Sequence, residues 1–152
     1  RIIWDANGTE IKFFNVKDGH GIKLLQRAGI RIGIITGRTS LVVDLRAKEL
    51  GIDLVYQGSL RKQDSYDEIK QITGLRDDQI AYMGDDVIDV PVMRRVGFAA
   101  APADAMPEAL AVADFIASRD GGMGAVREFC DLILKCRGDW DHLVKERYEL
   151  LN

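Results

Sequence analysis

Short apolar runs alternate along the chain with longer segments whose apolar residues recur at helical spacing. The runs have the length and composition of buried strands, at 30–35, 54–56, 80–83, 97–100 and 114–117. The longer segments predict helices at 41–50, from 62 or 64 to about 73, and at 87–96. Strands that are apolar almost throughout are typical of a parallel sheet covered on both faces. The pattern therefore predicts an α/β fold in three layers, with a central parallel sheet and right-handed crossovers.

The first residues predict a hairpin. Segments 1–4 and 9–14 are β-prone, and the pair Asn7-Gly8 between them favours a tight turn. A helix is expected next, ending at Gly29 and with Asp18 as its N-cap.

The last third of the chain predicts helices. The glycine-rich stretch 121–124 reads as a hinge before a helix at 125–136, and a terminal helix is expected at 139–150 with Asp139 as its cap. The length of 152 residues suits a single domain over residues 1–152, with the hairpin in 1–17 and a helical tail in 121–152.

Composition narrows the class of protein. A net charge of −3 leaves no broad basic face, which argues against nucleic acid as a partner. No apolar run approaches the roughly 20 residues of a membrane-spanning helix, and the first residues lack a signal-peptide pattern, so a cytoplasmic location is expected. Cys130 and Cys136 point to different faces of the predicted helix, which favours free thiols.

The most unusual local feature is an acidic cluster directly after the strand at 80–83. Asp85, Asp86 and Asp89 follow Gly84 at the carboxyl end of that strand, the edge where ligands bind in open α/β sheets. Aspartate is also favoured at a helix N-terminus, which accounts for one of the three. Clustered carboxylates repel one another unless a cation or a lysine compensates. The residues alone leave both interpretations open.

Two other strands also end in polar residues. The strand at 30–35 leads to Thr36 and Arg38, and the strand at 54–56 leads to Lys62. In a parallel sheet these ends share one edge with the acidic cluster, so a hydroxyl, an ammonium and carboxylates converge. Such a set suits a phosphoryl group held beside Mg²⁺. Taken singly, Thr36 could cap a helix, and Lys62, Arg38 and Arg46 could be solvated charges.

These motifs resemble those of the haloacid dehalogenase superfamily of phosphatases. Segment 34–38 looks like its second motif, Lys62 after Gln57-Gly58 like its third, and segment 84–89 like its fourth. Segments 14–19, 56–58 and 121–128 are similar to one capless branch, the 3-deoxy-D-manno-octulosonate 8-phosphate (KDO 8-phosphate) phosphatases of lipopolysaccharide synthesis. The resemblance covers nearly the whole chain and implies a Rossmann-like fold without a cap domain.

The resemblance also implies roles for single residues. Asp85 would bind Mg²⁺ and Asp89 would position Lys62, which leaves Asp86 either to start the helix or to support the metal ligand from behind. Thr36 and Lys62 would hold the phosphoryl oxygens. The residues expected to face the sugar acid or its phosphate are Asn15, Lys17, Asp18, Gly19, Arg38, Arg46 and Lys62. Cationic groups among them suit an anionic substrate.

In the resembled branch four chains associate, with the hairpins at the centre and the segment near 121–124 reaching a neighbouring site. A homotetramer is therefore expected. One departure matters: the superfamily's first motif, Asp-x-Asp, should lie just upstream of the hairpin and is absent there. It supplies the nucleophile, the acid/base aspartate and two metal ligands. Since the missing strand would otherwise leave a gap between the strands ending at Thr36 and Gly84, we expect a further segment before Arg1.

Two hypotheses follow. The first is a Mg²⁺-dependent phosphatase acting on an acidic sugar phosphate, an octulosonate 8-phosphate or a related nonulosonate 9-phosphate, through an aspartyl-phosphate. The second is a non-catalytic member that serves oligomerisation, resembling the phosphatase-like tail of animal CMP-sialic acid synthetases. Loss of the first motif would favour the second hypothesis, whereas intact Thr36, Lys62 and Asp85 favour the first.

Overall fold

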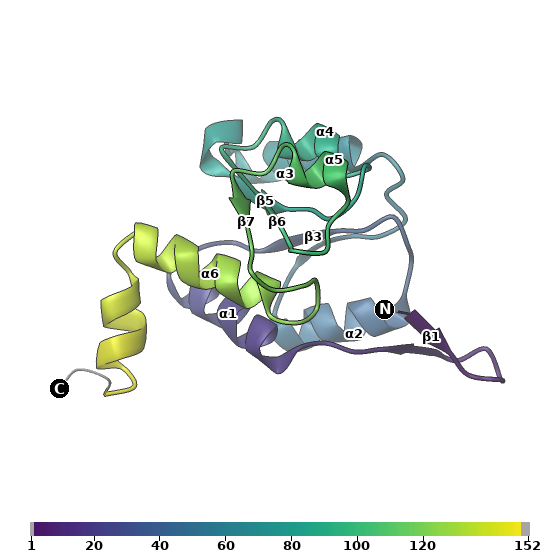
Figure 1. Ribbon diagram of the computed structural model, residues 1–152, viewed down its shortest axis with the longest axis horizontal. Coiled ribbons are helices and arrows are strands. Elements are labelled where there is room, and N and C mark those ends of the chain that lie inside the picture. Colours follow the sequence, from purple (N-terminus) through teal and green to yellow (C-terminus); the bar gives the residue numbers. More distant parts are fainter. Residues whose placement is uncertain (1, 150–152) are drawn as a thin grey trace.

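The structure is a computed structural model that describes residues 2–149. Strands and helices alternate along most of the chain (Figure 1). The strands are β1 (Ile2–Trp4), β2 (Glu10–Lys12), β3 (Gly33–Ile35), β4 (Leu54–Tyr56), β5 (Ala81–Met83), β6 (Phe98–Ala101) and β7 (Phe115–Ile116). The helices are α1 (Val16–Arg27), α2 (Leu41–Leu50), α3 (Lys62–Thr73), α4 (Val90–Met93), α5 (Pro107–Leu110) and α6 (Ala125–Cys136), with a short 3₁₀ turn η1 (Asp77–Gln79) and a π-helical turn η2 (Asp141–Glu146).

The strands after the hairpin pair in parallel, as the apolar runs predicted. β3 pairs with β4, and β5, β6 and β7 pair in that order. Within the described residues the two ladders are not hydrogen-bonded to each other, so the single central sheet that we expected is divided between β3 and β5. This division lies between the strands that lead to Thr36 and Gly84, where the resemblance places the strand of the first motif.

Helices cover both faces of the strands, which gives the expected three layers. In Figure 1, α3, α4 and α5 lie above the strands, and α1, α2 and α6 lie below them. The lower layer encloses the main core, where α1 packs along α6. Its buried residues are Leu24, Leu25, Cys130, Leu134 and Val144. Each Å² of apolar surface buried between the two helices contributes roughly 25 cal/mol to folding. Helix α6 is therefore part of the core of its own chain.

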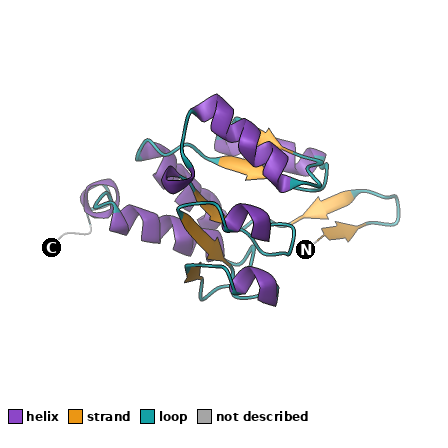
Figure 2. Ribbon diagram, turned by 90° about the horizontal axis from the view of Figure 1, so that it is seen from above, coloured by secondary structure: helices purple, strands orange, loops and turns teal. Residues whose placement is uncertain are grey.

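The N-terminal hairpin projects away from the helices, at the right of Figure 1 and at the end opposite η2 in Figure 2. β1 and β2 are antiparallel. In the turn, the Asp5 carboxylate accepts hydrogen bonds from the amides of Asn7 at 2.9 Å and Thr9 at 2.7 Å. Gly8 adopts a φ of 78°, which glycine takes at little cost, so the Asn-Gly prediction for this turn is confirmed.

Two predicted caps are wrong. Helix α1 begins at Val16, and Asn15 is its N-cap, with Oδ1 accepting from the Lys17 amide at 2.8 Å. Asp18 lies inside the first turn and is buried. At the other end, Asp139 does not cap a helix, because its carboxylate accepts from Arg137 Nε at 2.8 Å.

Two predicted helices are also shorter than expected. The helix at 87–96 is reduced to α4, because the preceding residues form a loop around Asp89. The terminal helix is reduced to η2, and its predicted end at residue 150 lies outside the described residues. Cys130 and Cys136 are free, as predicted. Among the described residues, no helix is long and apolar enough to cross a membrane.

Candidate active site

A buried ion pair lies at the carboxyl end of β5. Lys62, the first residue of α3, places Nζ 2.7 Å from Oδ1 of Asp89, the residue before α4. Asp89 is 1% exposed and Lys62 is 9% exposed. The N-terminus of a helix repels a cation, so the carboxylate is what makes a buried lysine acceptable at this position. The pair thus fixes one ammonium at the predicted ligand-binding edge.

The Asp89 carboxylate also holds the loop that follows β5. Its Oδ2 accepts hydrogen bonds from the amides of Asp85 and Asp86, both at 3.2 Å, while Oδ1 accepts from Tyr82 Oη at 2.5 Å. Burial pushes the pKa of Asp89 upward, but the hydrogen bonds from Lys62 and Tyr82 outweigh it and leave that pKa below its ordinary value. Asp89 is therefore an internal anchor rather than an open ligand.

Gly84 makes this arrangement possible. A Cβ built on Gly84 would lie 2.4 Å from Cβ of Asp89 and 3.0 Å from the sulfur of Met93. No other residue type fits this position without moving α4. The apolar run therefore ends in glycine because the loop must turn back over Asp89.

Asp85 differs from Asp89 in that it is exposed at the edge of the site. Its backbone is fixed, since its carbonyl accepts from the Met106 amide at 2.9 Å. Partial desolvation of the carboxylate, followed by the negative charge of Asp89, raises the pKa of Asp85. A bound cation would offset the repulsion between the Asp85 and Asp89 carboxylates, so Asp85 is suited to act as a metal ligand.

Asp86 contributes differently, because its Oδ1 accepts from the Val87 amide at 2.7 Å and so stiffens the loop. Within residues 2–149, no three carboxylate, histidine or cysteine side chains lie close enough together to enclose a metal. Mg²⁺ prefers six oxygen ligands, several of them commonly waters. Asp85 therefore supplies one carboxylate ligand that suits Mg²⁺, and the remaining ligand positions would be filled by other groups or by water.

The loop after β3 lies against this centre. A Cβ built on Gly37 would come within 3.9 Å of Cδ1 of Ile88, which places the Thr36–Arg38 loop beside the acidic loop. The Thr36 hydroxyl oxygen accepts from the Arg38 amide at 3.3 Å, and the Thr36 carbonyl accepts from the Ser59 amide at 3.0 Å. The loops after β3, β4 and β5 thus meet at one edge, as predicted.

A second group of predicted residues gathers around the start of α1. The guanidinium of Arg46 packs closely on Gly19: a Cβ atom placed on this glycine would lie only 2.3 Å from Nη2 of Arg46. Arg46 also pairs with Glu49 at 2.7 Å. Asn15 and Lys17 line an open cavity of about 380 Å³ together with residues of the β7–α6 loop and α6. Within the described residues, no hydrogen bond or ion pair joins this group to Lys62.

Asp18 has a role that its neighbours in sequence do not reveal. Its Oδ1 accepts a hydrogen bond from the Arg127 amide at 2.8 Å, in the first turn of α6. Gly124, the residue before α6, has no side chain with which to cap that helix. Asp18 therefore satisfies an otherwise free amide of α6 from across the helix pair, where a carboxylate is also favoured by the helix dipole.

Comparison with known proteins identifies the family. Residues 54–128 match the haloacid dehalogenase-like hydrolase family. The 3-deoxy-D-manno-octulosonate 8-phosphate phosphatase KdsC of Escherichia coli K12 is 43% identical over 135 residues, which cover 89% of this chain and 72% of the relative. This chain belongs to the KDO 8-phosphate phosphatase family. The membership confirms the resemblance drawn from the sequence motifs.

Solved structures of this phosphatase family share the fold. The structure of the enzyme from Yersinia pestis matches with a TM-score of 0.90 and 44% identity, covering 91% of this chain and 75% of that one. The structure from Moraxella catarrhalis, which is in complex with magnesium, phosphate and KDO, matches with a TM-score of 0.92 and 41% identity, covering 95% and 83%. The predicted α/β phosphatase fold is therefore confirmed.

Sequence reasoning missed one member of the site, Tyr82. It stands in a strand that is otherwise apolar, and a buried tyrosine hydroxyl nearly always needs a partner. That mismatch was the available signal. Two stretches that could be mistaken for the family's first motif have aspartates that are engaged elsewhere. Asp5 accepts hydrogen bonds in the hairpin turn, and Asp139 and Asp141 pair with Arg137 and Lys145.

Proposed function

We propose that this chain is the phosphatase domain that hydrolyses KDO 8-phosphate to KDO and phosphate, with Mg²⁺ as cofactor, in lipopolysaccharide synthesis. The observation that carries the proposal is the buried Lys62–Asp89 pair beside the exposed carboxylate of Asp85. Family membership supports the same activity, because the curated relatives that the chain matches are KDO 8-phosphate phosphatases.

Lys62 serves the phosphoryl group as a fixed positive charge. Three hydrogen atoms sit on its ammonium group, and Asp89 accepts one of them, which leaves the others to face phosphoryl oxygens. Because Asp89 also holds the amides of the neighbouring loop, the charge stays in place without reorganising as the reaction proceeds. The Thr36 hydroxyl, at the end of β3, supplies a further donor to the same oxygens.

Asp85 is the residue of this chain that would hold Mg²⁺, and Asp86 supports it by fixing the loop. When bound, the metal would neutralise charge on the phosphoryl oxygens. Asp85 contributes a negative charge at a fixed backbone position. The Asp89 carboxylate keeps that backbone in place by accepting a hydrogen bond from the Asp85 amide. Thr36 and Lys62 would thus bind the phosphoryl oxygens, and Asp85 would bind the metal ion.

The sugar end of the substrate belongs with the residues around the start of α1. Lys17 and Arg46 provide cations for a carboxylate or phosphate here, and Arg38 provides one from the loop after β3. Asn15 lines the cavity beside Lys17, and Gly19 leaves room for the Arg46 guanidinium. Asp18 supports this wall by capping α6. These assignments rest on the position of the residues and on the family's acidic sugar substrates.

The nucleophile stays a prediction. The family's aspartyl-phosphate mechanism requires an Asp-x-Asp strand, and the carboxylates of Asp5, Asp139 and Asp141 are engaged away from Lys62.

Assembly and location complete the proposal. A homotetramer built around the hairpins is supported by large apolar side chains that are exposed there: Ile2, Ile3, Trp4, Ile11 and Phe13. The exposed residues 121–123 would reach a neighbouring site, whereas α6 belongs to the core of its own chain. The cytoplasmic location stays a prediction. Light scattering on the purified protein tests the tetramer directly.

The activity is tested by phosphate release from KDO 8-phosphate by the full-length protein, with Mg²⁺ and with a chelator. We expect release that depends on Mg²⁺ and is faster than release from a nonulosonate 9-phosphate. Faster release from the nonulosonate would move the substrate to the related branch. No release from either sugar phosphate would contradict the proposal and favour the oligomerisation scaffold.

A further inference from the structure

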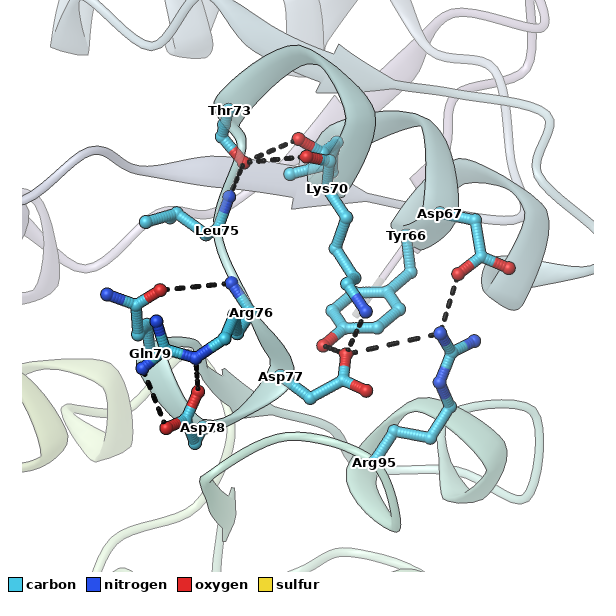
Figure 3. A network of polar contacts seen from close by, with 11 residues as sticks. Tyr66, Asp67, Lys70, Thr73, Leu75, Arg76, Asp77, Asp78, Gln79 and Arg95 are labelled. Atoms are coloured by element: carbon cyan, nitrogen blue, oxygen red, sulfur yellow. Dashed lines mark hydrogen bonds and ion pairs between the residues drawn. The ribbon is translucent and has the colours of Figure 1, made fainter.

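A polar cluster connects α3 to the segment that carries Asp89, at a distance from the ion pair itself. We call it the α3–α4 clamp and define it by five residues: Tyr66, Asp67, Lys70, Asp77 and Arg95 (Figure 3). None of these residues was assigned a role by the sequence motifs.

The clamp begins one helical turn below Lys62. Tyr66 follows Lys62 by four residues, so both side chains lie on the same face of α3. Tyr66 is 1% exposed, and its hydroxyl donates to Oδ1 of Asp77 at 2.6 Å. Lys70, one more turn along, places Nζ 2.6 Å from the same oxygen. One face of α3 is thus fastened to the 3₁₀ turn η1 that leads into β5.

Arg95, two residues after the end of α4, makes the connection to the other segment. Its Nη2 donates to Oδ1 of Asp67 at 2.6 Å, and its guanidinium lies over the Tyr66 ring with 4.8 Å from Cζ to the ring centre. A planar guanidinium can make both contacts at once, which a lysine ammonium does less well. Figure 3 shows Arg95 reaching these two side chains from the adjoining turn.

One hydrogen-bonded stretch of backbone joins Arg95 to Asp89. The Met93 amide donates to the Asp89 carbonyl at 2.9 Å, and the Arg95 amide donates to the Val92 carbonyl at 2.9 Å. The Gly97 amide, next along, donates to the Asp77 carbonyl at 2.7 Å. The two segments therefore touch twice: at their starts through Lys62 and Asp89, and further along through the clamp.

We propose that the α3–α4 clamp is a positioning device that sets the distance between the start of α3 and Asp89, and so keeps the Lys62 ammonium in the place where the phosphoryl group binds. A flexible lysine side chain loses much rotamer entropy when it is held, so one ion pair holds it weakly unless the backbone at both ends is fixed. The proposal rests on the proposed function for its kinetic consequence, whereas the positioning itself is independent of activity.

The test uses Arg95→Met, which removes the Arg95 contacts with Asp67, with the Tyr66 ring and, at 4.0 Å, with Asp77, and Tyr66→Phe, which removes only the hydroxyl bond to Asp77. Arg95→Lys is the conservative variant. Arg76→Met is the matched control, because Arg76 forms an exposed ion pair with Asp78 in the same turn and does not contact α3 in the described structure. For each full-length variant we would measure kcat and KM, the melting temperature, and the rate at which an amine-acylating reagent labels Lys62, read by mass spectrometry against the exposed Lys48.

For Arg95→Met we expect Lys62 labelling to rise several-fold and kcat to fall about 10-fold with a smaller change in KM, since a displacement of 1 Å at a reacting group can cost up to 100-fold. Arg95→Lys should recover part of both effects, and Tyr66→Phe should show both in a milder form. If Lys62 labelling rises in an enzyme that shows no phosphatase activity, the positioning stands and the proposed function fails. If the melting temperature falls while labelling and kcat match Arg76→Met, the clamp only stabilises the fold and the proposal is overturned.

Discussion

The two regions assigned to the substrate are built in opposite ways. Lys62 and Asp89 are both buried, and they pair with each other before any ligand arrives. Around Lys17, an open cavity of about 380 Å³ is lined by charged side chains of both signs, and that of Lys17 is exposed. The difference teaches that the phosphoryl end depends on a rigid internal pair, whereas the sugar end depends on solvated charges that each contribute little.

Lys62→Met should give the largest effect. It leaves the buried Asp89 carboxylate without its cation and removes a donor from the phosphoryl group. We expect kcat/KM to fall by at least about 100-fold. Urea unfolding should show a loss of about 3 kcal/mol in unfolding free energy, because a buried charge is left unpaired. Lys48→Met, on the exposed side of α2, is the control. A variant with near-normal kcat/KM would show that Lys62 is only structural.

Asp85→Asn tests the metal assignment. A neutral amide is a poorer ligand for a hard cation, so a magnesium titration of activity should shift to concentrations about 10-fold higher or more. Stability should change little because Asp85 is exposed. Asp53→Asn, an exposed aspartate beside β4, serves as the control. An unchanged magnesium dependence would remove Asp85 from the metal site.

Tyr82→Phe should remove one hydrogen bond to the Asp89 carboxylate and leave its contacts with Lys62 and the loop amides in place. Loss of one hydrogen bond to a charged group costs about 1.5–3 kcal/mol. The pKa of Asp89 is lowered in the folded protein, so its stabilising effect is present above the unfolded pKa and is lost as the pH falls through the folded value. Without the hydroxyl that pKa should rise, so the acid-unfolding midpoint should move to higher pH. Circular dichroism during acid titration measures the shift, and a midpoint equal to that of the wild type would argue against this role.

Lys17→Ala should give the smallest effect, since an exposed charge pair contributes about 0.2–1 kcal/mol, or up to roughly 5-fold in KM. We expect KM to rise for the acidic sugar phosphate and to stay the same for a small aryl phosphate. Lys135→Ala, on the far end of α6, is the control. Equal changes for both substrates would mean that Lys17 acts on the phosphate rather than on the sugar.

The sequence predicted the elements that have their own start and stop signals. Helices at 41–50 and 125–136 were predicted with their observed bounds. The first ends at Gly51, whose φ of 67° is a natural helix stop, and the second follows the hinge at Gly124. The meeting of the loops that carry Thr36, Lys62 and Asp85 followed from the rule that parallel strands end at one edge.

What the sequence could not predict depends on contacts between distant segments. Asp18 was taken as the cap of its own helix, but it caps α6 through Arg127, which is 109 residues away. Tyr82 was missed because a strand that is apolar on both faces does not reveal which side chain points toward Asp89. The helix at 87–96 was predicted too long at its start because the loop before α4 turns over the same carboxylate, with the amides of Asp85 and Asp86 bound to it.

The account's central claim is that Lys62, fixed by Asp89, binds the phosphoryl group. Calorimetric titration of the full-length protein with inorganic phosphate in the presence of Mg²⁺ tests this most directly, because it requires no turnover. We predict that Lys62→Met weakens phosphate binding at least about 10-fold relative to the wild type, the equivalent of losing one charged hydrogen bond. Equal phosphate affinity in the two proteins would contradict the account.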